Sequence, residues 1–236
     1  MELETIKHRG YTIKIEQDEC PTESPRDWDN LGTMTCWHRN YSLGDKHDFK
    51  ELVALWVDLC GNESIQEEFY YHDWLNDEQK ERAIKLAYQN NVILPLYLYD
   101  HSGITMRTSP FSCRWDSGQV GYIYISHDKI RKEYGWKKLT KARLEKIKQY
   151  LIGEVETYDN YLTGSVYGYV IEDRNGEEID SCWGFYGYDH EASGLMENAQ
   201  NAVDCNIQNN INQHIEKLKG WIRNQVALHY REPCHV

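Results

Sequence analysis

An Asn-Gly pair at Asn175-Gly176 separates two strand-like runs, and this signal constrains the fold of the chain more than any other feature. Asn-Gly is the strongest short-range signal for a tight hairpin, because both residues tolerate the positive φ angles of a type I′ turn. The runs at 166–172 and 178–185 are therefore predicted to pair as antiparallel neighbours.

Further strands are predicted where apolar and polar residues alternate or where short apolar runs are bounded by turn residues. Gly121–Ile125 alternates strictly, and Pro95 within 92–100 indicates an edge position or a bulge in that strand. The remaining predicted strands are 10–16, 31–38 and 104–108.

Helices are predicted from capping residues and from apolar stripes at steps of three and four. Asp48–Glu51 has the pattern of a capping box and opens a helix that ends at Gly61, and Asn76–Gln79 opens a second helix that ends at Asn90-Asn91. A short helix at 129–134, a long one at 141–162 and a C-terminal one at 195–226 complete the set, with Gly220 as a point of bending or division.

Strands grouped by hairpins, with helices inserted between the groups, indicate an α+β fold rather than alternating βαβ units. We expect a mainly antiparallel sheet of six to seven strands with a long C-terminal helix. We also expect one domain over 1–236, in which 190–236 is a candidate helical extension packing on it.

Composition narrows the functional classes. The net charge of −12 argues against a general affinity for nucleic-acid backbones, except through 129–148, where nine basic residues stand against two acidic ones. No run is long and apolar enough for a membrane span, and the start of the chain lacks a signal-peptide pattern, so we expect a cytoplasmic protein with no membrane partner. The seven cysteines are expected to be free, mostly buried thiols.

The first candidate site is the stretch from Ser24 to His38. Asp27 and Asp29 flank Trp28 in a loop before a strand, an arrangement suited to a hard cation or, with higher weight, to a capped turn beneath an aromatic cover. On an alternating strand, Cys36 and His38 share a face, as a nucleophile and its base or simply as core neighbours.

The second candidate is the loop 109–119. Arg114 beside Cys113 would favour the thiolate, and Asp116 and Trp115 follow in the same loop. Because no histidine is adjacent in the sequence, a buried thiol that helps the loop to fold is the stronger interpretation of Cys113.

The third candidate, 181–190, contains Trp183 among glycines and aromatic residues, which are typical of a strand end where a ligand or another backbone comes close. Cys182 and His190, together with Cys113 and His101, are zinc-type ligands, but their spacing does not require a metal. The common phosphate-loop, dinucleotide, zinc-protease and serine-hydrolase motifs are absent. No cofactor is therefore predicted, and a divalent metal is left open.

A basic group at the start of the long predicted helix is unusual, because a helix N-terminus favours carboxylates. Lys137, Lys138, Lys141 and Arg143 form this group. Plain solvation explains it, and so does an anionic partner: a phosphate-bearing ligand, a nucleic-acid strand or an acidic protein surface.

Three long segments resemble a family of uncharacterised proteins encoded by bacteriophages and by conjugative or plasmid-borne elements. They are SPRDWDNLGTMTCWHRNYSLGD, LPLYLYDHSGITMRTSPFSCRWDSGQVGYIYIS and GEVETYDNYLTGSVYGYVIEDRNGEEIDSCWGFYG. The resemblance implies a mobile-element origin and a role against host defence or in element maintenance, and it assigns no reaction or cofactor.

Two functional hypotheses follow. The first is a non-catalytic inhibitor, of the anti-CRISPR or anti-restriction type, that binds a host protein or protein complex in the host cytoplasm. The negative charge of the chain outside 129–148 and the large number of Tyr and Trp residues support this hypothesis. The second is a hydrolase-like or nuclease-like enzyme whose loops 17–30, 109–119 and 181–190 converge. In this enzyme, Asp27, Asp29, Asp100 and Asp116 would hold a metal, and Arg26, Arg39 or Arg114 would hold phosphate.

Overall fold

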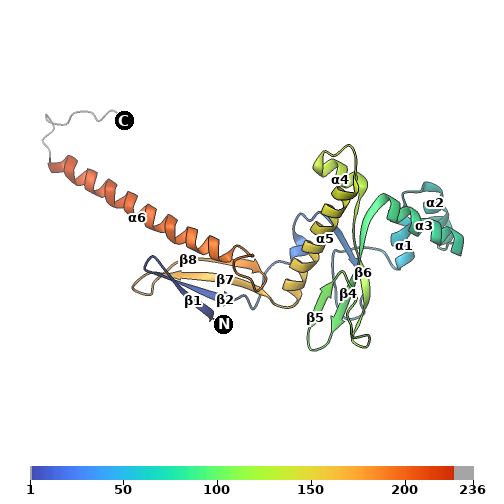
Figure 1. Cartoon of the computed structure of the whole chain (residues 1–236), viewed down its shortest axis with the longest axis horizontal. Coiled ribbons are helices and arrows are strands. Elements are labelled where there is room, and N and C mark those ends of the chain that lie inside the picture. Colours follow the sequence, from blue (N-terminus) through green and yellow to red (C-terminus); the bar gives the residue numbers. More distant parts are fainter. Residues whose placement is uncertain (1, 226–236) are drawn as a thin grey trace. The chain divides into compact units, whose positions relative to one another are not determined.

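The computed structural model describes residues 2–225, and contacts divide the chain into two compact units. Unit 1 combines residues 1–20 with 165–236, and unit 2 is the continuous stretch 21–164 (Figure 1). The prediction of one α+β domain over 1–236 stays a prediction. Of the predicted C-terminal extension, 226–236 lies outside the described residues.

Unit 1 contains one four-stranded antiparallel sheet in the order β1-β2-β7-β8. Its strands are β1 (Glu2–His8), β2 (Tyr11–Gln17), β7 (Val166–Glu172) and β8 (Glu178–Tyr186). The hairpin predicted around Asn175-Gly176 is confirmed: β7 and β8 are antiparallel neighbours, and Gly176 has a φ of 82°. β1 had no counterpart in the predicted strands.

Helix α6 (Leu195–Gln225) covers one face of this sheet with its first half. Leu195, Ala199 and Val203 pack on alternate residues of β2 and β7, among them Ile13 and Tyr169, so one face of each strand is apolar. α6 continues without a break through Gly220, and its second half extends past the sheet (Figure 1). The apolar side chains of that half are exposed, at Ile211, Ile215, Leu218, Trp221 and Ile222.

Unit 2 contains a second four-stranded antiparallel sheet in the order β3-β6-β4-β5. Its strands are β3 (Thr33–Cys36), β4 (Asn91–Asp100), β5 (Ile104–Arg107) and β6 (Ser117–Ser126). The α+β class and the antiparallel pairing are therefore confirmed, but the prediction of one sheet with six to seven strands is wrong: the described residues form eight strands in two sheets.

Helices cover both faces of the unit 2 sheet (Figure 1). On one face, α5 (Lys141–Leu162) and α4 (His127–Tyr134) pack on side chains such as Leu96 and Ile123. On the other face, α1 (Leu52–Cys60), α2 (Glu63–His72) and α3 (Asp77–Asn90) pack on the alternate residues, including Ile93 and Tyr122. A sheet that is buried on both faces explains why β4 reads as an almost continuous apolar run.

Local signals explain several boundaries. The capping box at Asn76 and Gln79 is present at the start of α3 as predicted, and the amide of Asn91 donates to the carbonyls of Leu59 and Ala87, so one side chain closes the ends of α1 and α3. Pro95 lies beside a register shift, in the part of β4 that β5 does not reach. This position leaves no ladder hydrogen bond on that side for proline to break.

The capping box predicted at Asp48–Glu51 is wrong. α1 begins only at Leu52, and its N-cap, Glu51, makes no side-chain capping bond. The indole of Trp37 donates to the carbonyl of Phe49 (2.9 Å) and thereby holds this stretch outside the helix. The end of α1 is as predicted, because Gly61 adopts the left-handed conformation that stops a helix.

Candidate functional site

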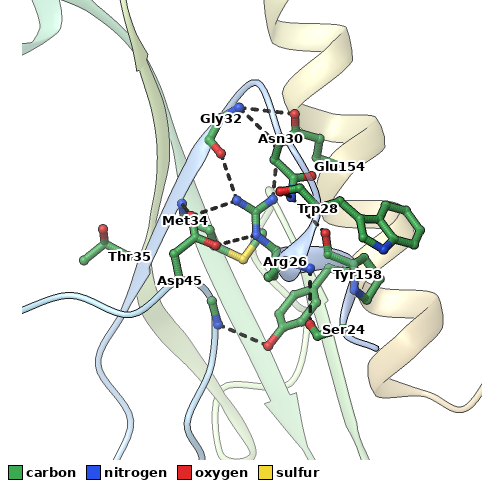
Figure 2. A network of polar contacts seen from close by, with 12 residues as sticks. Ser24, Arg26, Trp28, Asn30, Gly32, Met34, Thr35, Asp45, Glu154 and Tyr158 are labelled. Atoms are coloured by element: carbon green, nitrogen blue, oxygen red, sulfur yellow. Dashed lines mark hydrogen bonds and ion pairs between the residues drawn. The ribbon is translucent and has the colours of Figure 1, made fainter. Parts of the chain in front are cut away.

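The first candidate stretch contains a buried ionic network around Arg26 (Figure 2). The 3-10 turn Pro25–Asp27 places the guanidinium between β3, the following loop and α5. Its Nε and Nη2 bind the two carboxylate oxygens of Asp45 (2.7 and 2.8 Å), and Nη1 binds Glu154 (3.1 Å). Nη2 also donates to the Gly32 carbonyl at 2.8 Å.

Both carboxylates have further partners, so the network is closed. Glu154 accepts from the backbone amides of Leu31 and Gly32, and Asp45 accepts from Met34. Burial acts to lower the pKa of Arg26, but the hydrogen bonds and charges of Asp45 and Glu154 outweigh it, and the net pKa is raised. With a side chain only 4% exposed, Arg26 cannot reach a ligand phosphate, and the prediction of such a role is wrong.

Asp27, Trp28 and Asp29 lie at the outer edge of this network. All three are exposed, Trp28 at 47%. The capped-turn interpretation expected Asp27 or Asn30 to cap this turn. The side chain of Ser24 caps its start, and the side-chain amide of Asn30 donates to the carbonyls of Pro25 and Trp28 (2.8 and 2.9 Å).

The Cys36 and His38 pair does not form a nucleophile and base. Burial, followed by the negative charge of Asp45, raises the pKa of Cys36 to about 12, so its sulfur remains a thiol at neutral pH. The Nδ1 atom of His38 accepts from the backbone amides of Asn40 and Tyr41 (3.3 Å each), and its ring stacks on Tyr41. This engagement of Nδ1 leaves no free base on that side of the ring.

The second candidate loop brings together a thiol, a carboxylate and a histidine. Cys113 Sγ lies 3.6 Å from Asp116 Oδ2, and the Nδ1 of His101, from the β4–β5 turn, lies 3.5 Å from the same oxygen. The carboxylate therefore stands between thiol and imidazole, whereas an activated cysteine needs the imidazole next to its sulfur. Sequence reasoning missed this approach of His101, which depends on the pairing of Asp100 with Asp116.

The rest of that loop is a surface feature. Trp115 is 96% exposed and Arg114 is exposed, so neither is held for chemistry by the fold. The hydroxyl of Tyr41 donates to Asp100 (3.2 Å), which links the His38 segment to the β4–β5 turn. Within residues 2–225, no group of three or more His, Cys, Asp or Glu side chains could hold a metal ion.

The third candidate segment belongs to unit 1 and is described separately from the other two. Trp183 is 44% exposed and lies over Gly168 of β7, where an added Cβ would meet the indole at 2.3 Å. The close approach predicted at the glycines of 181–190 is not seen at Gly184, where an added Cβ would meet nothing within 4 Å; the crowded glycine is Gly168, on the neighbouring strand. The convergence of the three segments on one site stays a prediction.

The exposed aromatic residues of α2 and its turn were missing from the predicted sites. Tyr70, Tyr71 and Trp74 are 70%, 85% and 60% exposed, while Ile65 and Phe69 on the opposite side of α2 are buried. We call these three residues, together with the carboxylates Glu63 and Glu67, the α2 face. A hollow of about 580 Å³ is lined by Glu63, Gln66, Glu67, Tyr70 and Tyr71.

A local signal for α2 exists in the sequence. Asn62 caps the helix through the Ile65 amide (3.1 Å), and Ile65 and Phe69 are spaced four apart, as expected for one helical face. More carboxylates follow close in the sequence, at Glu68, Asp73, Asp77, Glu78 and Glu81. Large aromatic rings in solvent, bordered by charges of one sign, are typical of a protein interface.

No helix among residues 2–225 has the length and apolar character needed to cross a membrane. Comparison with known proteins found no match among protein-family models, curated proteins or solved structures.

Proposed function

We propose that this protein is a non-catalytic accessory protein of a mobile genetic element, that it inhibits a host defence complex by binding to it, and that the α2 face is its contact surface. The exposure of Tyr70, Tyr71 and Trp74 is the observation that carries the proposal. The sequence resemblance described above supplies the mobile-element setting.

Two features of the α2 face suit protein binding. Tyr and Trp bury a large area and lose few rotamers on binding, which is why they dominate interface hot spots. The carboxylates at Glu63 and Glu67 border the aromatic hollow and would attract a basic partner surface. A defence complex that normally holds nucleic acid has such a surface.

The alternative of a phosphate-binding or metal-dependent enzyme rests on weaker support. Arg26 is used internally, Cys36 is a buried thiol, and Cys113 faces a carboxylate. The enzyme hypothesis therefore depends on Arg39 or Arg114 for phosphate and on Asp27, Asp29, Asp100 and Asp116 for a metal, although among residues 2–225 no three such ligands are grouped to hold an ion.

The proposal is tested in cells that carry one restriction or CRISPR system each. We expect expression of the protein to raise the plating efficiency of a targeted phage in at least one such strain and to change nothing in the strain without the system. No relief in any strain would contradict the inhibitory function.

Two matched triple variants then locate the surface. Y70A/Y71A/W74A removes the α2 aromatics, and W28A/W115A/W183A removes three exposed rings from the segments predicted first. We expect the α2 variant to weaken binding of the purified target about 30-fold or more, the loss typical of a single hot-spot side chain of 2 kcal/mol. If only the second variant loses binding, the α2 face is not the contact surface.

A further inference from the structure

The basic segment 129–148 has more positively charged side chains than take part in ion pairs or hydrogen bonds in the structure. Lys129 donates to the carbonyls of Asn30 and Leu31, Arg131 pairs with Asp128, and Lys148 pairs with Glu145. Within residues 2–225, no ion pair involves Lys137, Lys138 or Lys141, and all three are exposed.

The connection between α4 and α5, which carries Lys137 and Lys138, is held by contacts of Trp136 and Arg143. The ring of Trp136 is stacked on Tyr134 (4.5 Å between centroids) on one side and lies 4.8 Å from the Arg143 guanidinium. Nη1 of Arg143 also donates to the carbonyl of Lys138 at 2.7 Å. Arg143 is thus a structural residue, whereas the neighbouring lysines point their charge into solvent.

The position of the lysines adds to the local positive potential. They surround the N-terminus of α5, a 22-residue helix capped by Thr140, where the helix dipole is also positive. A bound anion would relieve the repulsion between these charges.

A cavity with an aromatic side chain in its wall lies beside Lys141. It has a volume of about 550 Å³, and its lining includes Lys141, Lys148, Glu145, His127 and Tyr88. The Tyr88 ring stacks on Trp56 (5.7 Å, 30°) and is still 49% exposed. Burial, followed by the charge of Arg131, lowers the pKa of His127, so its imidazole is neutral at pH 7 and offers hydrogen bonds instead of charge.

We propose that this surface binds single-stranded nucleic acid, with backbone phosphates at Lys137, Lys138 and Lys141 and a base in the cavity against Tyr88. A groove of cations beside an exposed ring provides the two contacts that single strands use, phosphate pairing and base stacking. An acidic protein would also pair with the lysines, but a single strand presents a planar base at every nucleotide for stacking on Tyr88. The acidic remainder of the chain opposes a wide duplex more than a narrow single strand.

The test uses the full-length protein and fluorescein-labelled dT20 or U20, with binding followed by anisotropy between 50 and 300 mM salt. We expect binding that weakens with salt. K137S/K138S/K141S should lower affinity at least tenfold at the lowest salt and should reduce the slope of log K against log salt by about 2, since single strands contribute about 0.7 per phosphate contact.

Controls separate this site from general charge effects. K46S/K50S/K217S removes the same charge from exposed positions elsewhere and should leave affinity unchanged. Y88A should lower affinity by about tenfold with the same salt slope, and Y88F should bind like the parent, because stacking does not need the hydroxyl. Thermal unfolding checks that each variant is folded.

Three results would overturn the proposal: no binding to either oligonucleotide at 50 mM salt, equal losses in the two lysine variants, or displacement of dT20 by polyglutamate as effective as by unlabelled dT20. The last result would assign the lysines to an acidic protein. Because the α2 face shares no residue with this surface, Y70A/Y71A/W74A should bind dT20 normally.

Discussion

Among single residues, Arg26 makes ionic hydrogen bonds that an apolar side chain at the same position could not make. It joins the turn after unit 1, the β3 strand and the middle of α5 through two carboxylates and a backbone carbonyl. A buried charge without a partner destabilises the folded state far more than a fully paired ionic network does.

Replacing Arg26 with Met should therefore lower the free energy of unfolding by about 3–5 kcal/mol, because Asp45 and Glu154 would face each other without a cation. Urea unfolding measures the change. Arg131→Met, which breaks an exposed pair with Asp128, is the matched control and should cost under about 1 kcal/mol. Equal effects would show that the Arg26 network is not a stabilising unit.

Six cysteines among the described residues are free thiols, and only Cys36 and Cys60 are buried, so the expectation of mostly buried thiols is wrong for this part of the chain. The pKa of Cys36, raised to about 12, links folding to pH. An unfolded thiol loses its proton near pH 8.5, whereas the folded one retains it, so stability is fully present below about pH 8.5 and falls as pH rises towards 12.

Between pH 8.5 and 10, we expect Cys36 to make the free energy of unfolding fall by up to about 1.4 kcal/mol per pH unit. Urea unfolding at each pH gives the slope. Cys36→Ala removes this contribution and should flatten the decline, while Cys20→Ala, at an exposed thiol, should leave it as it is. Identical slopes in all three proteins would contradict the raised pKa.

At the scale of elements, helix α6 has two halves with different roles. The first half provides Leu195, Ala199 and Val203 to the core of unit 1, whereas Ile211, Ile215 and Leu218 in the second half are exposed. The same apolar periodicity thus continues from a buried face onto an open one.

Leu195→Ala should cost about 2–5 kcal/mol of unfolding free energy, because it removes a fully buried side chain. Ile215→Ala, at 42% exposure, should change stability by less than about 0.5 kcal/mol. Thermal and urea unfolding of the two variants test the difference. A large loss in Ile215→Ala would mean that a partner covers the second half in solution.

Sequence reasoning was most successful where a local pattern decides the structure. The bounds of α5 follow from its apolar stripe at steps of three and four, and β7 and β8 follow from Asn175-Gly176. It failed where a distant contact decides: the Trp37 indole keeps Phe49 out of α1, and β1 is a strand only because β2 pairs with it.

The same division holds for the candidate sites. Exposed residues such as Trp115 could be identified from their loops, but the approach of His101 to Asp116 depends on strand pairing between β4 and β6. The α2 face was missed because no predicted element covers residues 62–75, although the Asn62 cap and the spacing of Ile65 and Phe69 indicate the helix.

For the whole molecule, the order of the strands along the chain shows that one unit is inserted into the sequence of the other. Unit 2 is inserted between β2 and β7, which pair directly, and the amide of Asp18 donates to the carbonyl of Val166 at 2.8 Å. Unit 1 therefore amounts to a four-stranded meander and a helix, with a second unit in place of one hairpin loop.

Deleting residues 21–164 and joining Cys20 to Ser165 with two glycines should leave unit 1 folded, since Gln17 and Tyr167 are already paired. Circular dichroism and a cooperative thermal transition would show this. If the shortened chain is unfolded while the full chain unfolds in one transition, the two units form a single cooperative domain.

The pairing of β2 with β7 also sets an order of events on the ribosome. The β1–β2 hairpin is translated before unit 2, and the strand that pairs with β2 follows only after all of unit 2 has been translated. An isolated two-stranded hairpin is only marginally stable in water. The unpaired edge of β2 therefore stays exposed until β7 has been translated and pairs with it. Translation speed through unit 2 thus determines how long the nascent chain is open to aggregation.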